Sequence, residues 1–422
     1  MKETTRATLR KLANRMFAFR NMVFPIPKSN SSNFGAKSIV ESYQVCKGIS
    51  YRNELFERKF LKQSVHVLEV DLTNKDSELQ LNIPQPLRSL QTTEEQARNG
   101  KENKVLAAVN AAFFETIEGI AGLPASLIVK DGEIIRYGRN SENLSGPIFQ
   151  KQAFGLLSNG KARIGEYESN ITMRVDDRRI PVFSMNDVMP RIGKAVLYTE
   201  SDKPLPASFL SNPTVEIIVD NVDKDMKTIS FGTTITGTVK QLLNSSSKNK
   251  LHVPKDGFVI LATGNAMVET LGDIQVGSEL SVSLELDNHW KEANFVLGSG
   301  PYLVKNGETH ITMNLSSPLA STRQPRTAVG ISEDGSKVLL ITVDGRQRGY
   351  SDGMTMVELA DFFLTCGMEQ AINLDGGGSS TMVLQKPGDT MPSLVNRPAD
   401  GIQRKVSATI QLIQKESNEE FH

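Results

Sequence analysis

The chain has 422 residues, which is enough for one large domain or about two to three ordinary ones, each with a hydrophobic core. Its 48 basic and 48 acidic residues cancel, so the molecule as a whole offers no general electrostatic attraction to nucleic acid. The two cysteines, Cys46 and Cys366, lie far apart and the five histidines include no HExxH and no close pair. Zinc-cluster, disulfide-scaffold and zinc-hydrolase classes are therefore not indicated, although one bridge between the cysteines is left open.

Residues 1–45 are predicted to be a basic amphipathic segment followed by a linker. Glu3 is the only acidic residue up to Val40, against eight basic ones. The apolar residues of this segment recur at helical spacing, three and four positions apart: Leu9, Leu12, Met16, Phe19 and Val23. Such a helix would dock on the domain, dock on a partner, or lie on an anionic membrane surface.

No apolar run approaches the roughly 20 residues that span a bilayer, and the start of the chain lacks a clear secretory signal. These features predict a cytoplasmic or peripheral location. Membrane contact would be through the N-terminal basic helix.

Residues 46–415 are predicted to form the folded domain, and residues 416–422 a polar tail. Alternating apolar and polar residues at 64–72 predict a half-buried strand, and an apolar run at 105–109 predicts a buried one. Asp131-Gly132 separates two apolar runs and is typical of a hairpin turn. Between about 171 and 292, short apolar runs alternate with turn residues, which predicts a β-rich insert before a core at about 293–415.

The strongest local unit follows this insert. Strands are expected at 326–331 and 338–343, then a helix from about Met356 to Cys366, then a strand at 371–374. Thr355 and Glu358 have the T-x-x-E spacing of a capping box. This order permits a βαβ crossover with both loops at one sheet edge, although an antiparallel arrangement is left open. The expected fold class is α+β (mixed α/β), a central mixed β-sheet with flanking helices and the β-rich insert.

A glycine-rich junction ends the last of these strands. The carboxylate of Asp375 is followed by three glycines and three hydroxyl residues, namely Gly376, Gly377, Gly378, Ser379, Ser380 and Thr381. Consecutive glycines let the backbone approach a ligand closely, and hydroxyls supply donors without bulk. The alternative is an ordinary glycine-rich turn.

Asp344-Gly345-Arg346 repeats the same pattern, a carboxylate and a glycine directly after an apolar strand. Two such carboxylates suit acid, base or nucleophile chemistry at an anomeric carbon, and they can also hold a hard cation. Each alone would equally open a turn. Several arginines lie in the same third of the chain, and guanidinium binds phosphate or carboxylate oxygens through paired donors: Arg326, Arg346, Arg348, Arg397 and Arg404.

Other nucleotide and hydrolase motifs are missing from the sequence or lie in an unsuitable context. No GK[ST] follows the glycine triplet, and Gly298-Ser299-Gly300 does not complete GxGxxG. The one G-x-S-x-G match, Gly349-Tyr-Ser-Asp-Gly353, is predicted to be a loop that leads into a helix and not a nucleophile elbow. A P-loop, a dinucleotide fold and a serine hydrolase therefore lack support.

Four stretches resemble the phosphodiester glycosidase domain family in order and spacing: Arg326-Thr-Ala-Val-Gly, Thr342-Val-Asp-Gly-Arg346, Ser351 to Ala360, and Asn373 to Thr381. Weaker similarity extends over most of 48–414. The chain departs from the family where Ala111 and Ala125 stand at positions that are commonly glycine. These departures put the sugar preference in question.

The resemblance implies hydrolysis of a sugar-1-phosphodiester, of the N-acetylglucosamine-1-phosphodiester type, to free sugar and a phosphomonoester. It implies catalytic roles for Asp375 and Asp344 at the anomeric carbon or activating water, and for Arg326 and Arg346 on the phosphate. The substrate-binding residues expected with them are Asn110, Phe114, Ser299, Gly300, Ser351, Thr355, Gly376, Gly377, Gly378, Ser379, Ser380, Thr381 and Arg404.

Two rival functions are left open, a non-catalytic binder of phosphoglycan or cell-envelope glycan and a cation-dependent phosphodiesterase. The expected partner is a phosphorylated glycan substrate, with no nucleic acid. No cofactor is certain, and a divalent cation is left open. By resemblance the protein would act in bacterial carbohydrate metabolism, at the cell envelope or outside the cell.

Overall fold

The computed structural model describes residues 34–99, 104–116, 121–138, 151–187, 193–199, 213–225, 229–245 and 252–415. The chain divides into two compact units, residues 1–33 and residues 34–422, and the description below concerns the second. The predicted amphipathic helix and the predicted polar tail lie outside the described residues. Residues 36–45, predicted to belong to the linker, are part of the first strand.

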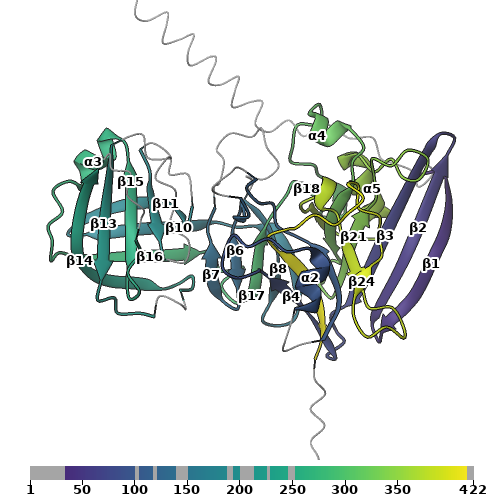
Figure 1. Ribbon diagram of the computed structural model, residues 1–422, viewed down its shortest axis with the longest axis horizontal. Helices are drawn as coiled ribbons and strands as arrows, with labels where there is room; N and C mark the ends of the chain where they lie inside the picture. The colour runs from purple at the N-terminus through teal and green to yellow at the C-terminus, as the bar shows by residue number, and fades with distance from the viewer. Residues whose placement is uncertain are drawn as a thin grey trace, which may run out of the picture. The chain divides into compact units, whose positions relative to one another are not determined.

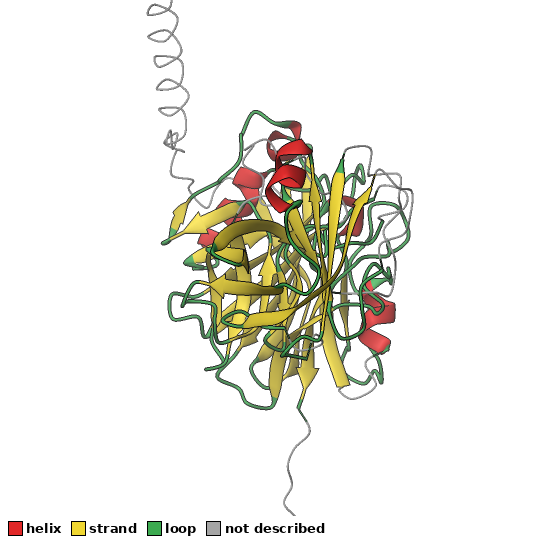
Figure 2. Ribbon diagram, turned by 90° about the vertical axis from the view of Figure 1, so that its left-hand side faces the viewer, coloured by secondary structure: helices red, strands yellow, loops and turns green. Residues whose placement is uncertain are grey.

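The predicted α+β fold class is wrong, because the described part of the chain is built mainly of strands (Figure 2). Its α-helices are short, with 6, 7, 4 and 10 residues: α2 (Thr93–Arg98), α3 (Asn265–Leu271), α4 (Pro318–Ser321) and α5 (Met356–Thr365). The central sheet is not mixed, since its strands pair antiparallel throughout. Hairpins therefore account for most of the chain, and sheets rather than helices cover much of the central sheet.

The central sheet has eight strands in the order β1 (Ala36–Cys46), β2 (Ile49–Arg58), β3 (Leu61–Asp71), β21 (Lys337–Val343), β20 (Arg326–Ile331), β22 (Gln370–Asn373), β18 (Tyr302–Lys305) and β19 (Glu308–Thr309). Two five-stranded sheets accompany it. One has the order β24 (Ser393–Leu394), β23 (Met382–Leu384), β5 (Lys104–Asn110), β25 (Thr409–Gln414) and β4 (Ser77–Asn82). The other has the order β7 (Glu133–Arg136), β6 (Ile128–Lys130), β17 (Ala293–Gly298), β8 (Gln152–Leu157) and β9 (Ala162–Glu166).

The predicted β-rich insert is a closed barrel. Its strands follow the order β10 (Ser169–Val175), β11 (Arg178–Met185), β12 (Ala195–Tyr198), β15 (Phe258–Thr263), β13 (Thr214–Asp220), β14 (Thr234–Ser245) and β16 (Glu279–Leu286). In Figure 1 the sheet that contains β6, β8 and β17 lies between this barrel and the central sheet. The barrel interior belongs to an apolar core that also includes Val129, Ala153 and Val296 of the neighbouring five-stranded sheet.

The strands predicted at 64–72, 105–109, 326–331 and 338–343 are confirmed within a few residues as β3, β5, β20 and β21. The hairpin turn at Asp131-Gly132 is confirmed, and both residues have positive φ angles of 53° and 79°. The capping box of α5 is confirmed in full, because the Thr355 side chain accepts from the Glu358 backbone and the Glu358 side chain accepts from the Thr355 backbone.

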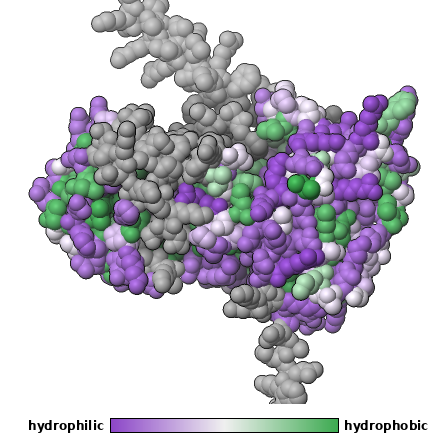
Figure 3. Space-filling view, viewed as in Figure 1, coloured by the Kyte–Doolittle hydropathy of each residue, from purple (hydrophilic) through white to green (hydrophobic). Residues whose placement is uncertain are grey.

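The middle strands β20, β21 and β22 of the central sheet are buried on both faces, which explains their continuous apolar runs. In β21, Leu340 contributes to the core shared with the five-stranded sheets, whereas Leu339 and Ile341 face a second core against α5. Elsewhere the visible surface is mainly hydrophilic with scattered apolar residues (Figure 3). Within the described residues, no helix combines the length and apolar character needed to cross a bilayer.

The register of the central sheet brings two loops to one edge. β20 lies between β21 and β22 and is antiparallel to both, so that Arg326 pairs with Val343 and Ala328 with Asn373. β21 and β22 therefore run parallel and end at the same edge. This confirms that Asp344 and Asp375 follow strands whose ends lie together.

Phe34 opens the described chain as a core residue. It is 5% exposed, and its ring centroid lies 5.3 Å from that of Phe56 and 6.0 Å from that of Phe362. This aromatic cluster packs the residue just before β1 against α5.

We expect Phe34→Ala to lower the free energy of unfolding by about 3 kcal/mol, because truncation leaves a cavity beneath α5. Urea denaturation measures the change. Phe60→Ala is the matched control, since Phe60 is 90% exposed and its loss should be nearly neutral. Equal stability of the two variants would show that Phe34 does not belong to the core.

Candidate functional site

The glycine-rich junction after β22 forms a tight loop whose glycines admit two guanidinium groups. Gly377 has a φ of +63°, and a Cβ placed there would lie 3.2 Å from Nη2 of Arg346. A Cβ at Gly378 would lie 2.1 Å from Nη2 of Arg404. The missing side chains thus leave room for both arginines against the loop backbone.

Asp375 lies at the start of this loop with a strongly perturbed carboxyl group. Desolvation raises its pKa to about 7, against opposing effects from the Ser379 side chain, the positive charge of Arg404 and the backbone N–H of Gly376. Burial of a carboxylate disfavours its ionised form, and the nearby donors and cation recover only part of that cost. A carboxyl group balanced near neutral pH in such a setting is suited to proton transfer or to nucleophilic attack.

Asn110, at the end of β5, positions Asp375. Its Nδ2 donates to the Asp375 carbonyl at 2.5 Å, while its Oδ1 accepts from Thr327 Oγ1 at 2.7 Å and from the Thr381 N–H at 3.0 Å. The side chain is fully buried, so these bonds replace water. Asn110 therefore joins β5, β20 and both ends of the glycine loop, and its own polar atoms are already engaged.

Arg326 is buried at the start of β20 and pairs with no carboxylate among the described residues. Its Nε donates to the Met354 carbonyl at 2.9 Å, and its Nη2 donates to the carbonyls of Leu319 and Thr322 at 2.8 Å and 3.1 Å. Desolvation, with help from the nearby charge of Arg346, lowers its pKa to about 10. Arg326 thus organises the surrounding backbone and adds positive charge, part of which the nearby charge of Glu358 offsets.

Arg346 follows Asp344 and has a backbone φ of +61°, which is unusual for a residue with a Cβ. Its Nε donates to Gln324 Oε1 at 2.7 Å, an interaction that holds its guanidinium close to the glycine loop. Arg404 reaches the same loop while paired with Asp400 at 2.8 Å. The structure therefore brings Arg346 and Arg404 together at Gly377 and Gly378.

Asp344 is placed differently from Asp375, since its carboxylate is buried and fully engaged. Oδ1 accepts from Asn396 Nδ2 at 2.9 Å, and the Arg397 N–H donates to both carboxylate oxygens at 3.0 Å and 3.1 Å. Oδ2 accepts from Tyr350 Oη at 2.8 Å and lies 3.0 Å from His66 Nε2. These contacts favour a positioning role for Asp344, and a direct role at the substrate stays a prediction.

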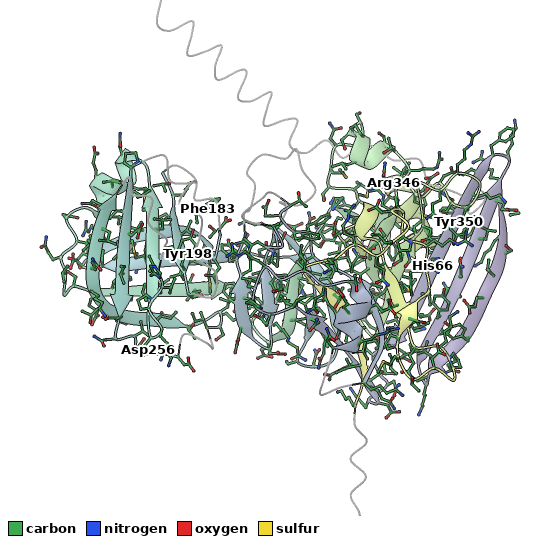
Figure 4. All side chains as sticks on the ribbon, viewed as in Figure 1. His66, Phe183, Tyr198, Asp256, Arg346 and Tyr350 are labelled. Carbon is green, nitrogen blue, oxygen red and sulfur yellow. The ribbon has the colours of Figure 1, made fainter. Side chains whose placement is uncertain are left out.

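The residues around Asp344 extend this network across the sheet edge. His66 Nδ1 lies 2.8 Å from Tyr51 Oη, and the Arg397 guanidinium lies 4.1 Å from the centre of the Tyr350 ring. Asn396 Nδ2 also contacts the Ser380 carbonyl at 3.1 Å, which links Asp344 to the glycine loop. Figure 4 shows His66, Tyr350 and Arg346 in the same part of the molecule.

Sequence reasoning missed His66, Tyr350 and Asn396 as members of this network. His66 lies in a strand that alternates apolar and polar residues, where a histidine has no special signal. Tyr350 lies only six positions after Asp344, but no pattern in the sequence marks its hydroxyl as a partner of that carboxylate. Asn396 lies 52 positions from Asp344. Only the position of Asn396 in Asn396-Arg397-Pro398, a weak family similarity, could have indicated its role.

The remaining predicted site residues mostly support the backbone around the two aspartates. Ser299 Oγ donates to the Asn373 carbonyl at 2.9 Å, and Asn373 Nδ2 donates to the Gly300 carbonyl at 3.3 Å, so this pair supports β22 just before Asp375. Ser351 is buried with its hydroxyl bonded to the Asp344 carbonyl at 2.6 Å, and Thr355 caps α5. Phe114 is half-buried and forms a β-bridge with Pro124.

The three hydroxyl residues also differ in their surroundings. Ser379 hydrogen bonds to Asp375 and modulates its pKa. The hydroxyls of Ser380 and Thr381, together with Oδ1 of Asn373, are buried without a hydrogen-bond partner among the described residues. Such unsatisfied atoms are costly unless a ligand or water completes them.

The described residues contain no group of three His, Cys, Asp or Glu side chains arranged to hold a metal ion. Both cysteines are free thiols, so the bridge left open by the sequence is not formed.

Comparison with known proteins finds a family whose model matches part of this chain. Residues 214–413 match the family model described as phosphodiester glycosidase, which confirms the resemblance predicted from the sequence. An N-acetylglucosamine-1-phosphodiester alpha-N-acetylglucosaminidase from Bos taurus is 35% identical over 104 residues, 22% of this chain and 19% of that protein. An uncharacterized SPbeta prophage-derived protein from Bacillus subtilis is 30% identical over 143 residues, 34% of this chain and 20% of that protein.

The chain thus spans about a fifth of the length of these relatives. Among solved structures, a hypothetical protein from Synechocystis superposes with a TM-score of 0.68 at 18% identity, covering 90% of this chain and 64% of that one. At this identity the similarity concerns the fold alone.

Replacement of aspartate by asparagine is predicted to change the Tm in opposite directions at Asp375 and Asp344. Because the folded protein binds this proton more tightly than the unfolded chain, where the carboxyl has its ordinary value of 3.8, stability falls as pH rises from about 4 to about 7. Asp375→Asn removes this penalty, so we expect its Tm to exceed that of the wild type by about 2 °C or more at pH 8 and to match it near pH 4.

Asp344→Asn should instead lower the Tm at pH 8, because an amide NH2 would face the donors that the carboxylate now accepts. Calorimetry of both variants across this pH range checks the pair. A destabilised Asp375→Asn at pH 8 would contradict the argument that burial dominates the ionisation of Asp375.

Proposed function

We propose that this chain, whose residues 214–413 match the phosphodiester glycosidase family, hydrolyses a sugar-1-phosphodiester at the anomeric carbon and releases free sugar and a phosphomonoester. The observation that carries the proposal is a carboxyl group with a pKa of about 7 that shares a glycine loop with two arginines. Family membership of this domain supports glycosidase activity on phosphodiester sugars, and the sugar itself belongs to the proposal.

The arginines are proposed to bind the phosphodiester. Arg346 and Arg404 lie against Gly377 and Gly378, while buried Arg326 adds positive charge without a carboxylate partner among the described residues. Like charges brought together cost free energy unless an anion offsets them, and guanidinium donors fit phosphate oxygens well. A bound phosphate would offset this repulsion, and the backbone N–H groups of the glycine loop would add donors.

The phosphate also simplifies the chemistry of bond cleavage. A phosphomonoester leaves as a stabilised anion, so neutralisation by arginine replaces much of the proton donation that an ordinary glycoside needs. Asp375 is then free to act in its ionised form, either as the nucleophile at the anomeric carbon or as the base that activates water. Its side chain is the only predicted catalytic carboxyl whose hydrogen bonds do not already saturate it.

Asp344 is proposed to hold the loop that carries Arg346. Its bonds to Tyr350 and Arg397 fix both sides of that loop, and Asn396 transmits the same constraint to Ser380. A displaced loop would move Arg346 away from Gly377, so a positioning role still affects catalysis.

The proposed sugar is N-acetylglucosamine or a close analogue. The bovine relative is named for action on an N-acetylglucosamine-1-phosphodiester. The region that the family model matches, residues 214–413, includes Arg326, Arg346 and the glycine loop. Ala111, which the sequence comparison marked as a departure, is fully buried and its carbonyl accepts the Asp375 N–H at 3.1 Å. This departure therefore stands at a residue whose backbone is bonded to that of Asp375.

We expect Asp375→Asn to abolish turnover of N-acetylglucosamine-1-phospho-methyl ester while the protein stays folded, because the amide keeps the shape and loses the charge. Arg346→Ala should lower kcat/KM by about 1.5–3 kcal/mol in transition-state free energy, since a charge-assisted contact to phosphate is lost. Arg348→Ala, on the same exposed loop, is the matched control and should retain activity.

Two further measurements decide what these variants mean. Product analysis should detect free sugar, whereas a sugar 1-phosphate would establish the cation-dependent phosphodiesterase instead. With an aryl glycoside that carries no phosphate, Arg346→Ala should lose little relative to wild type, and Asp375→Asn should remain inactive. Equal losses for Arg346→Ala on both substrates would assign the arginine to the sugar or to the fold.

The pKa of Asp375 also predicts the pH dependence. If the ionised carboxylate reacts, kcat/KM should rise with pH through about 7 and then level off. Arg404→Gln removes a cation that lowers this pKa, so the rising limb should move to higher pH. A rate that instead falls above pH 7 would identify Asp375 as a general acid.

A further inference from the structure

The turn between β2 and β3 exposes an aromatic side chain to solvent. Strand β2 ends at Arg58 and β3 begins at Leu61, so Lys59 and Phe60 form a two-residue turn. Phe60 is 90% exposed, the highest value among the large hydrophobic residues of the described chain. A single exposed apolar side chain is common on protein surfaces, so the surroundings of Phe60 decide whether it marks a contact surface.

Local folding does not explain these two residues. Two-residue hairpin turns favour Asn-Gly or Asp-Gly, because the backbone there adopts positive φ angles. Lys59 nevertheless has a φ of +47°, and Phe60 contributes almost no buried area to the core. A turn that departs from its favoured residues without a gain in packing is expected where the surface has another role.

The surroundings of Phe60 are basic. The Lys59 ammonium lies 5.5 Å from the centre of the Phe60 ring. An open cavity of about 580 Å³ beside the turn is lined by three basic residues and one acidic residue together with two apolar ones: Arg58, Lys59, Arg323, Asp352, Phe60 and Leu61. Arg323 is paired with Glu358, so the excess positive charge comes from the turn itself.

The sequence that precedes this part of the fold is also strongly basic. Residues 1–33 contain seven basic residues and one acidic residue. That segment and the turn both carry the charge that an anionic surface attracts.

We propose that the Lys59-Phe60 turn is a docking site for a membrane surface rich in anionic lipid, with the Phe60 ring inserted at the headgroup boundary. The aromatic ring would gain apolar contact, while Lys59 and Arg58 would meet lipid phosphates. This inference does not depend on the proposed enzymatic function.

A lipid surface fits better than a soluble polyanion or another protein chain. A polyanion would interact favourably with the cations but would leave the exposed ring in water, whereas a membrane boundary would interact favourably with both. The turn is also coupled to the loop that follows Arg346, because the Lys62 N–H donates to Asp352 Oδ2 at 3.1 Å and Gln63 Nε2 donates to the Gly353 carbonyl at 3.1 Å. Docking would therefore place the candidate site beside the membrane.

The experiment uses the full chain with Phe60→Trp as a reporter. The native protein has one tryptophan, Trp290, which is 1% exposed and supplies a constant background. We expect the emission of the introduced indole to shift to shorter wavelength and to be quenched by brominated lipid when vesicles contain phosphatidylglycerol, but not with phosphatidylcholine alone. Val276→Trp, in the barrel at a position that is 64% exposed, is the control and should show neither change.

Co-sedimentation then measures the contribution of each group. Phe60→Ser and Lys59→Glu should each weaken binding to phosphatidylglycerol vesicles by about tenfold. High salt should weaken binding of the native chain more than binding of Lys59→Glu. Lys255→Glu, on an exposed barrel loop, makes the same charge change and should leave binding nearly unaltered.

Several outcomes would overturn the proposal. One is sedimentation with vesicles without quenching at position 60, which would assign binding to residues outside the turn. Another is binding to heparin as tight as to vesicles, lost in Lys59→Glu but kept in Phe60→Ser, which would indicate a soluble polyanion. A native dimer that Phe60→Ser dissociates in sedimentation velocity would identify a second copy of the chain as the occupant.

Discussion

The candidate site depends on one buried amide. Asn110 donates to the backbone of Asp375 and accepts from Thr327 and Thr381, so a single side chain joins β5, β20 and the glycine loop. These strands belong to two different sheets, and each bond satisfies a group that is removed from water. Without this junction the loop would have no fixed relation to β20, and the arginines would have no defined surface to approach. A fully satisfied polar network of this kind specifies one arrangement of the elements it joins.

The site concentrates charges that folding alone would avoid. The folded protein raises the pKa of Asp375 and lowers that of Arg326 by desolvation, so both groups are less stable in their ionised forms here than in water. Arg326 lies near the like charge of Arg346, which the smaller effect of Glu358 opposes, and Arg346 itself has a left-handed backbone. Asp344 shows the opposite design, since every part of its carboxylate meets a donor. The contrast separates a group available for chemistry from a group that maintains the scaffold.

The architecture explains how such a site stays rigid. The central sheet packs on α5 through one face and on the two five-stranded sheets through the other, so the ends of β21 and β22 are fixed from both sides. The barrel packs in a different core, which it shares with the sheet that contains β6, β8 and β17. Antiparallel pairing of β20 with both neighbours brings two strand ends to one edge without the helical layers of a doubly wound fold. The Synechocystis structure supports the same overall fold at low sequence identity.

Local sequence determined much of this protein. Alternating and apolar runs predicted β3, β5, β20 and β21, Thr355 and Glu358 predicted the start of α5, and the order of Asp344 and Asp375 after their strands predicted that both would reach one edge. These features depend on residues that are close together in the chain. The α+β expectation failed because an apolar run does not reveal whether a helix or another sheet covers it. The separate fates of the two aspartates were also decided only by the tertiary structure, since the donors around Asp344 come from positions 66, 350, 396 and 397. Desolvation likewise depends on the complete packing around a group. No local pattern could therefore distinguish the desolvated carboxyl group of Asp375 from the fully hydrogen-bonded one of Asp344.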